Sequence, residues 1–114
     1  MIVNVPSSLA VKNGTFVHTA GTIRLPTGCR SALVSLGLAA NAGYTVAVKQ
    51  SVSASATASK ANCSRILATL NTGDTNIIGR PAGAGIWYLA FRIYNGATAA
   101  AGSSSDKYAI DCLD

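Results

Sequence analysis

Apolar and polar side chains alternate with a period of two along much of this chain, a pattern that predicts β-strands. In the longest such segment, residues 86–94, one face carries four large apolar side chains: Trp87, Leu89, Phe91 and Ile93. Burying each of them is worth roughly 1.5–3 kcal/mol. We therefore expect a central strand with this face in the core. Its other face carries Tyr88, Arg92 and Tyr94.

Shorter segments alternate in the same way between turn-forming Gly, Pro and Asn residues. They cover residues 21–25, 31–38, 44–49, 75–78 and 107–113. We expect residues 31–38 and 44–49 to pair as an antiparallel hairpin. A short helix competes over residues 60–70, but Ile66, Ala68 and Leu70 also fit the alternation of a strand, so we favour a strand.

Asn-Gly dipeptides indicate two turns. Asn13-Gly14 predicts a hairpin between residues 9–12 and 15–20, because both residues tolerate positive φ, and Asn95-Gly96 ends the central strand. Residues 51–59 and 97–105 are dominated by Ala, Ser, Thr and Gly. We expect both to be loops, or in the first case a flat edge strand.

Together these segments indicate an all-β fold. Strand-length segments recur with turn signals between them, which predicts a single antiparallel β-sandwich or jelly-roll-like barrel of about seven or eight strands. At 114 residues the chain is long enough for one core and too short for two, so we expect residues 1–114 to be one domain. Residues 1–6, which end at Pro6, are expected to form an extended N-terminal arm.

The surface is expected to be poor in charge. Charged residues make up 11% of the chain and Glu is absent, which suits a protein packed against copies of itself or a larger lattice. The net charge of +5 comes from nine basic residues with no run of two. Because nucleic-acid grooves need clustered charge, we attribute the excess to a shortage of acids, with weak steering toward an acidic partner as the alternative.

The first residues lack the basic run and apolar stretch of a secretory signal, and no segment has the length of a membrane span. We therefore expect assembly in the cytoplasm and no membrane partner. The three cysteines, Cys29, Cys63 and Cys112, argue against a full disulfide framework or a zinc site. Burial as small apolar residues is the default, and a pairing of Cys29 with Cys112 stays open.

We expect no catalytic, cofactor-binding or metal site, and no enzyme activity. The single histidine, His18, lies within a predicted strand, and no Ser has a nucleophile-elbow setting. Asp106, Asp111 and Asp114 could together hold Ca²⁺, but we favour solvated charges at a strand edge. The glycines of residues 79–85 lead into a strand and not into the helix that a phosphate loop needs.

Residues 83–90, Gly-Ala-Gly-Ile-Trp-Tyr-Leu-Ala, and 106–110, Asp-Lys-Tyr-Ala-Ile, resemble the end of bacterial pre-peptidase carboxy-terminal domains. In these sandwiches a Gly-x-Trp/Tyr-Tyr strand precedes a loop and a Tyr-x-hydrophobic strand. The calcium-binding acidic residues of that family have no counterpart around residues 41–44. Taken whole, the chain more closely resembles small virion proteins of tailed bacteriophages, which are short, Glu-poor, all-β and rich in Ala, Ser, Thr and Gly.

The bacteriophage resemblance implies a non-enzymatic capsid decoration or cement protein, or a small head or tail module, assembled in the host cytoplasm. It implies self-association and binding to the major capsid protein or another virion protein, without direct nucleic-acid contact. The alternative is a β-sandwich binding module of a secreted enzyme that recognises carbohydrate or protein. The residues that we expect at the interface are Ile2, Val3, Val5, Tyr88, Arg92 and Tyr94.

Overall fold

The computed structural model describes residues 11–15, 20–26, 28–68, 76–83, 85–103 and 105–113. Within these ranges the chain forms nine strands and no α-helix. The strands are β1 (Val11–Thr15), β2 (Ala20–Leu25), β3 (Ser31–Leu38), β4 (Thr45–Ser51), β5 (Arg65–Ala68), β6 (Ile77–Gly79), β7 (Trp87–Asn95), β8 (Thr98–Ala99) and β9 (Asp106–Leu113). The all-β prediction is confirmed, with the two-residue β8 as an addition. The expected N-terminal arm, residues 1–6, lies outside the described residues.

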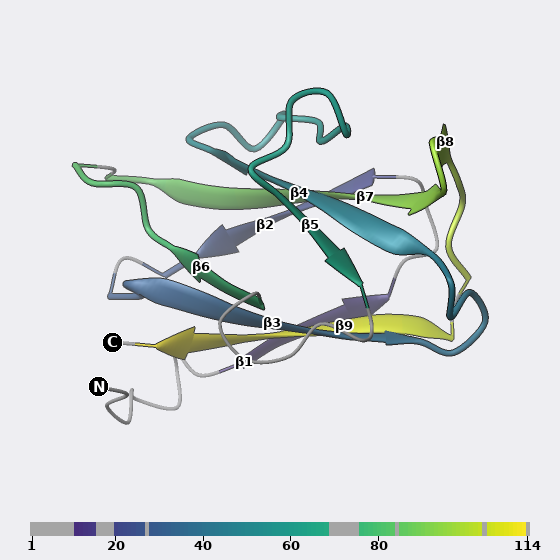
Figure 1. Ribbon diagram of the computed structural model, residues 1–114. Coiled ribbons are helices and arrows are strands. Elements are labelled where there is room, and N and C mark those ends of the chain that lie inside the picture. The colour runs from purple at the N-terminus through teal and green to yellow at the C-terminus, as the bar shows by residue number, and fades with distance from the viewer. Residues whose placement is uncertain are drawn as a thin grey trace.

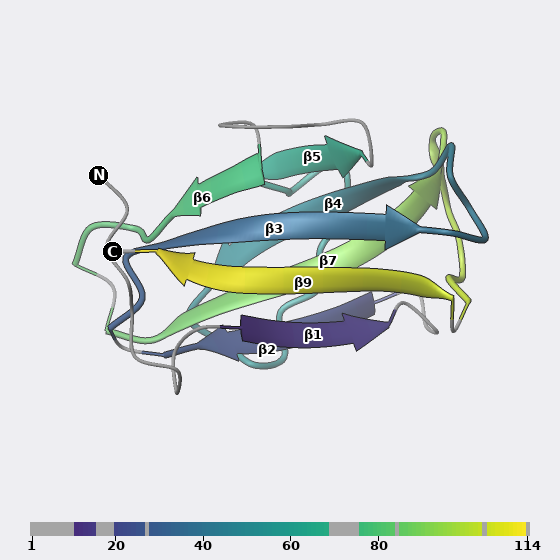
Figure 2. The same ribbon diagram turned by 90° about the horizontal axis from the view of Figure 1, so that it is seen from below.

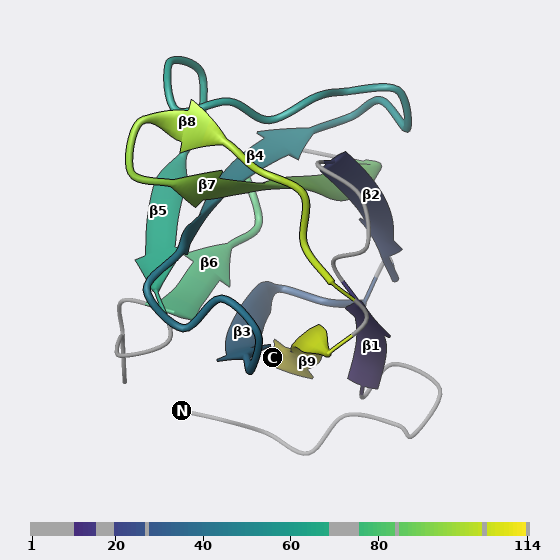
Figure 3. The same cartoon turned by 90° about the vertical axis from the view of Figure 1, so that its right-hand side faces the viewer.

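The strands form two antiparallel sheets that pack face to face (Figure 1). One sheet has the order β1-β9-β3-β6, and Figure 2 shows it from outside. The other has the order β2-β7-β4-β5, with β8 paired to the end of β7. Figure 3 gives a view from one end, with β7 and β4 in the upper layer and β3 and β9 in the lower one.

The strand pairing is that of a jelly roll. β1 pairs with β9, β2 with β7, β3 with β6 and β4 with β5, so the pairs are nested as in one long hairpin. The tip of this hairpin is the connection between β4 and β5, residues 52–64, which we call the β4–β5 loop. Successive pairs alternate between the two sheets. In one sheet the β3–β9 ladder connects the β1–β9 pair to the β3–β6 pair, and in the other the β4–β7 ladder connects the β2–β7 pair to the β4–β5 pair. This is the double-sheet jelly-roll arrangement.

β7 is the central strand that the sequence predicts. Its four expected core residues are each no more than 2% exposed: Trp87, Leu89, Phe91 and Ile93. The ring of Phe91 also stacks on Tyr108 of the facing sheet, with 5.3 Å between ring centroids. β2, β3 and β9 also contribute fully buried apolar residues to the core, among them Leu25, Val34 and Ile110.

A disulfide joins Cys29, in the turn between β2 and β3, to Cys112 in β9. The two Cα atoms lie 5.2 Å apart, and both residues are buried. The pairing that the sequence left open is therefore present. Cys63 is the free cysteine of the described residues.

Two predicted hairpins are wrong. β3 and β4 lie in different sheets, so the connection 39–44 crosses from one layer to the other. Asn13 and Gly14 lie inside β1, opposite Ala109 and Tyr108 of β9. Continuous pairing along this strand outweighs the local turn preference of the dipeptide.

The alternation of Ile66, Ala68 and Leu70 does not mark the inward face of β5, although a strand forms there. Leu67 is fully buried, whereas Ile66 is exposed, and Leu70 lies outside the described residues. The register places Leu67 opposite Val46, and cross-strand partners share a face. Where two apolar residues are adjacent in a short strand, the partner strand decides which of them is inward.

Replacing both Cys29 and Cys112 with Ser should lower the free energy of unfolding by about 2–5 kcal/mol, because the bridge joins residues 83 positions apart in the sequence. Urea denaturation of the oxidised protein and of the double variant measures the difference. Cys63→Ser is the matched control and should change stability little. A double variant as stable as the parent would contradict the structural role of the disulfide.

Candidate functional site

The outer face of β7 is where the sequence predicts an interface. Tyr88 and Arg92 are partly buried, whereas Tyr94 is only 7% exposed and Ala90 is fully buried. Part of the face is therefore covered by protein, although neither sheet packs on this side.

The cover is the β4–β5 loop, which lies across the outer face of the sheet (Figure 1). The backbone amide of Lys60 donates a hydrogen bond to the Tyr94 hydroxyl at 3.2 Å, and Lys60 Nζ lies 5.3 Å from the centre of the same ring. On β2, Thr22 Oγ1 donates to the carbonyl of Ala56 at 3.2 Å. Because Ala58 is also buried, the loop rests directly on the sheet.

The predicted interface residues therefore do not form one surface. Tyr94 belongs to the loop contact. Arg92 is half-buried, and its Nε has no hydrogen-bond partner among the described residues. Tyr88 lies toward the other end of β7 and is partly accessible. The remaining three lie outside the described residues: Ile2, Val3 and Val5.

A different group of residues lies around the start of β7, and we call it the Tyr88 patch: Arg24, Val52 and Ile86, which are exposed, and Tyr88, which is partly exposed. Arg24 on β2 and Ser51 on β4 lie opposite Tyr88 on its two sides. Val52 follows this β4 ladder and Ile86 directly precedes β7, with 68% and 43% of their surfaces exposed. Exposed large apolar side chains near a Tyr and an Arg are typical of contact surfaces.

Sequence reasoning found only one member of this patch, Tyr88. Val52 stands in the low-complexity residues 51–59, and Ile86 is the first residue of the predicted strand 86–94. Arg24 became a neighbour only through the β2–β7 register. The signal available in the sequence was two large apolar residues next to strand ends, which does not by itself bring them together.

Arg80 fixes the backbone beneath the patch. Its guanidinium donates hydrogen bonds to the carbonyls of Pro26, Cys29 and Gly85, at 3.2, 3.1 and 2.8 Å. It also lies 5.6 Å from the centre of the Trp87 ring. These bonds tie the β2–β3 turn to the segment that leads into β7, while the disulfide ties the same turn to β9. The patch therefore stands on constrained backbone.

Two arginines lie at the end of the sandwich that carries the patch. Arg24 and Arg30 are both exposed there. Of the described carboxylates, Asp106 is buried at the opposite end, and Asp111 lies on the outer face of the other sheet, opposite Leu33. Within the patch, the register places the cation of Arg24 beside Tyr88.

Asp106 begins β9 at the opposite end and is fully buried. Its carboxylate accepts hydrogen bonds from the backbone amides of Ala40 and Ser103, both at 3.0 Å, and from the Asn41 side chain. Burial alone would raise the pKa of Asp106, but these bonds stabilise the charged form and hold the pKa below its ordinary value. The carboxylate thereby fastens the β3–β4 connection to the start of β9.

The prediction of a solvated charge is therefore wrong for Asp106. Both of its oxygens accept hydrogen bonds from the chain, and Asp111 lies farther along β9, while Asp114 lies outside the described residues. Within the described ranges, no group of three potential metal-ligating side chains occurs. His18 also lies outside them.

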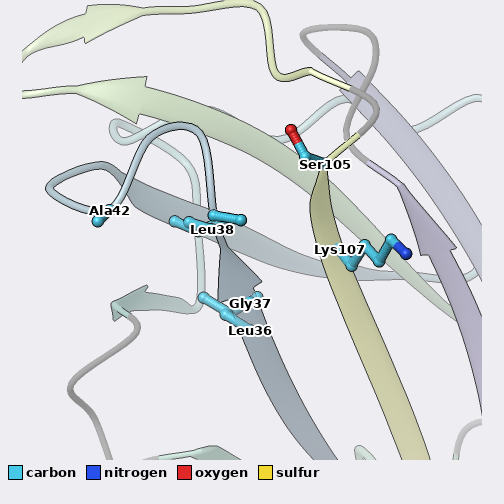
Figure 4. A pocket seen from close by; sticks show the side chains of 7 residues that line it. Leu36, Gly37, Leu38, Ala42, Ser105 and Lys107 are labelled. Atoms are coloured by element: carbon cyan, nitrogen blue, oxygen red, sulfur yellow. The ribbon is translucent and has the colours of Figure 1, made fainter.

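An open depression lies between the end of β3 and the start of β9 (Figure 4). Its lining includes Leu36, Leu38, Ala39, Ala42, Ser105 and Lys107. The lining contains no His, Cys or carboxylate, and its polar side chains are Ser105 and Lys107.

Comparisons of the chain with protein-family models, with curated proteins and with solved structures found no match. The described residues contain no helix that is long and apolar enough to span a membrane. A jelly roll hosts many unrelated functions, so function has to be argued from a site. In the described part of the chain, the Tyr88 patch is the surface with the strongest binding character.

Asp106→Asn should lower the free energy of unfolding by about 1.5–3 kcal/mol near neutral pH, because charge-assisted hydrogen bonds are weakened. Since folding lowers the pKa of Asp106, its contribution is complete above the pKa of the unfolded chain and is lost as the pH falls through the folded-state pKa. The difference from the parent should therefore shrink in acid. Urea denaturation over a pH series, with Asp111→Asn as control, measures this; a pH-independent difference would contradict it.

Tyr94→Phe should loosen the β4–β5 loop, because the Lys60 amide loses its acceptor, at a cost of about 0.5–1.5 kcal/mol. Trypsin cleaves after Lys60, so the cleavage rate at that bond reports opening of the loop. We expect faster cleavage in Tyr94→Phe and the parent rate in Tyr88→Phe, the same change on the same strand face. Equal rates in all three proteins would show that Tyr94 does not hold the loop.

Proposed function

We propose that this chain is a virion structural protein, a capsid decoration or small head or tail module, which acts by self-association and by binding a protein lattice. The observation that carries the proposal is the Tyr88 patch. Val52 and Ile86 are large apolar side chains left exposed beside Tyr88, with Arg24 at the edge. Burying these apolar side chains against a partner protein would be favourable, because it removes their surface from water.

Two further features support the proposal that the chain is part of a virus particle. The jelly roll recurs in viral capsid proteins, among other classes. The Cys29–Cys112 disulfide is typical of proteins that meet oxidising surroundings, virion surfaces included. We therefore infer assembly in the host cytoplasm and service in the released particle, where the disulfide persists.

The proposed partners are further copies of the chain and the major capsid protein or another virion protein. With 11% charged residues, copies can pack together while desolvating few charges. We propose that Ile2, Val3 and Val5 contact other copies of the chain. Tyr88 is proposed to contact the lattice, and Arg92, farther along β7, is proposed to support that contact. Tyr94 is assigned to the β4–β5 loop. The proposed activity needs no nucleic acid, cofactor or membrane.

The second candidate is a binding module of a secreted enzyme, and the disulfide favours it as well. Lectins also use jelly rolls, and the ring of Tyr88 beside Arg24 would then contact a carbohydrate. Such a module is expected to be monomeric, whereas the virion protein is expected to be a closed oligomer. Size-exclusion chromatography with light scattering, followed by a glycan array, separates the two.

Val52→Ser combined with Ile86→Ser should weaken binding to purified virus particles that lack the chain by about tenfold or more, because the apolar centre of the patch is lost. Co-sedimentation at increasing protein concentration measures the affinity. The matched control is Ile66→Ser, which changes an isoleucine on β5 that is 40% exposed, and it should bind like the parent. Parent-like binding by the double variant would overturn the proposal.

A further inference from the structure

We propose that the Cys29–Cys112 disulfide forms and breaks within the folded chain, through a local opening of the β2–β3 turn, residues 26–30, that Arg80 controls. This inference goes beyond the proposed function and requires neither a lattice nor a partner chain. It follows from the burial of the two sulfurs, the unequal support of the two cysteines and the hydrogen bonds that hold the turn.

Both cysteines are closed to solvent. Cys29 is fully buried, and Cys112 is 4% exposed. Thiol–disulfide exchange requires a thiolate to attack one sulfur directly, so its rate depends on access to that sulfur. A dissolved thiol therefore reduces this bridge only after part of the chain has moved.

The two cysteines differ in how firmly their backbone is held. Cys112 lies in β9, which pairs with β3 along all eight of its residues and with β1 through residues 107–111. Cys29 lies in the β2–β3 turn, which connects strands of different sheets. Local opening favours segments that are held by few interactions. Cys29 therefore moves outward more readily than Cys112.

Hydrogen bonds hold the turn independently of the disulfide. The Cys29 amide donates to the Pro26 carbonyl at 3.0 Å, and the Arg30 amide donates to the Leu113 carbonyl at 3.1 Å. Because Leu113 directly follows Cys112, the second bond keeps the two cysteine-bearing segments side by side when the bridge is reduced. The reduced chain therefore keeps the fold, with its two thiols close to each other.

Arg80 connects three carbonyls of the turn to the rest of the fold. Its backbone amide donates to the Arg30 carbonyl at 2.7 Å, and its guanidinium donates to the carbonyls of Pro26 and Cys29 at 3.2 and 3.1 Å. The same guanidinium donates to the Gly85 carbonyl at 2.8 Å, in the segment before β7. Moving Cys29 outward breaks the guanidinium bonds to the turn, so Arg80 sets how often the turn opens.

Reduction then takes place in two steps. The thiolate of a reductant such as glutathione attacks Cys29 Sγ, the S–S bond breaks, and Cys112 leaves as a thiolate that takes up a proton. A second glutathione thiolate attacks the glutathione sulfur of this mixed disulfide, which releases the Cys29 thiolate and oxidised glutathione. Oxidised glutathione reverses both steps: it accepts two electrons from the cysteine pair and leaves as two molecules of glutathione.

The test measures reduction of the folded full-length chain by glutathione at about pH 8, where thiolates form. A Cys63→Ser background ensures that the thiols counted by alkylation and mass spectrometry belong to the pair. Arg80→Lys keeps the charge but lacks the planar fork, and it should speed reduction about fivefold or more, the effect of one lost hydrogen bond. Arg24→Lys makes the same exchange on β2 and should leave the rate at the parent value.

Two measurements with Arg80 intact distinguish opening of the turn from unfolding of the chain. Opening the turn exposes little surface, so the reduction rate should stay nearly constant in up to about 1 M urea. Acid quenching followed by peptide mapping should find the glutathione adduct on Cys29. The near-ultraviolet circular dichroism of the reduced chain should match that of the oxidised chain.

Four results would overturn the inference. They are a parent-like reduction rate in Arg80→Lys, a rate that rises with urea as steeply as the equilibrium constant for unfolding, an adduct on Cys112, and loss of the near-ultraviolet signal on reduction. A melting curve shows whether Arg80→Lys is folded at the assay temperature. If it is not, the three measurements that keep Arg80 decide the question.

Discussion

The packing of one face of β7 against the opposite sheet is the contact on which the rest of the structure depends. β7 has β2 on one side and β4 on the other, so the inward direction of Trp87, Leu89 and Phe91 sets the inward faces of both neighbours. The residues that alternate with them, such as Ala90 and Tyr94, therefore point to the outer face of the sheet, where their apolar surface is buried only if another segment covers it. The β4–β5 loop provides that cover near Tyr94 and leaves the Tyr88 end open.

Alternation in the sequence was enough to predict most strands and their faces, because burial has the same period as the backbone pleat. It could not predict which sheet a strand joins. The inner faces of both sheets contact one core, so residues 31–38 and 44–49 carry the same pattern whether they pair or face each other. In β5, Ile66 and Leu67 are adjacent apolar residues, so the sequence alone does not show which of them points inward. The pairing of Leu67 with buried Val46 places Leu67 in the core.

The candidate site was predicted less well, because its contacts join distant parts of the chain. Thr22 meets Ala56, and Lys60 meets Tyr94, in each case across 34 positions, while Ala40 meets Asp106 across 66. Composition marked the β4–β5 loop as lacking apolar bulk, yet small side chains are what allow a loop backbone to lie on a sheet. The sequence therefore identified Tyr88 as a contact residue and could not show that a loop occupies Tyr94.

These features describe a constrained jelly roll with two different ends. A buried carboxylate closes one end, and arginines, apolar side chains and a disulfide shape the other. Hydrogen–deuterium exchange of the full chain, free and bound to virus particles, tests most directly whether the second end is the binding surface. Slower exchange in the bound state at residues 51–53 and 85–88, with residues 38–42 unchanged, is the predicted result. Protection confined to residues 38–42, or none at either end, would contradict it.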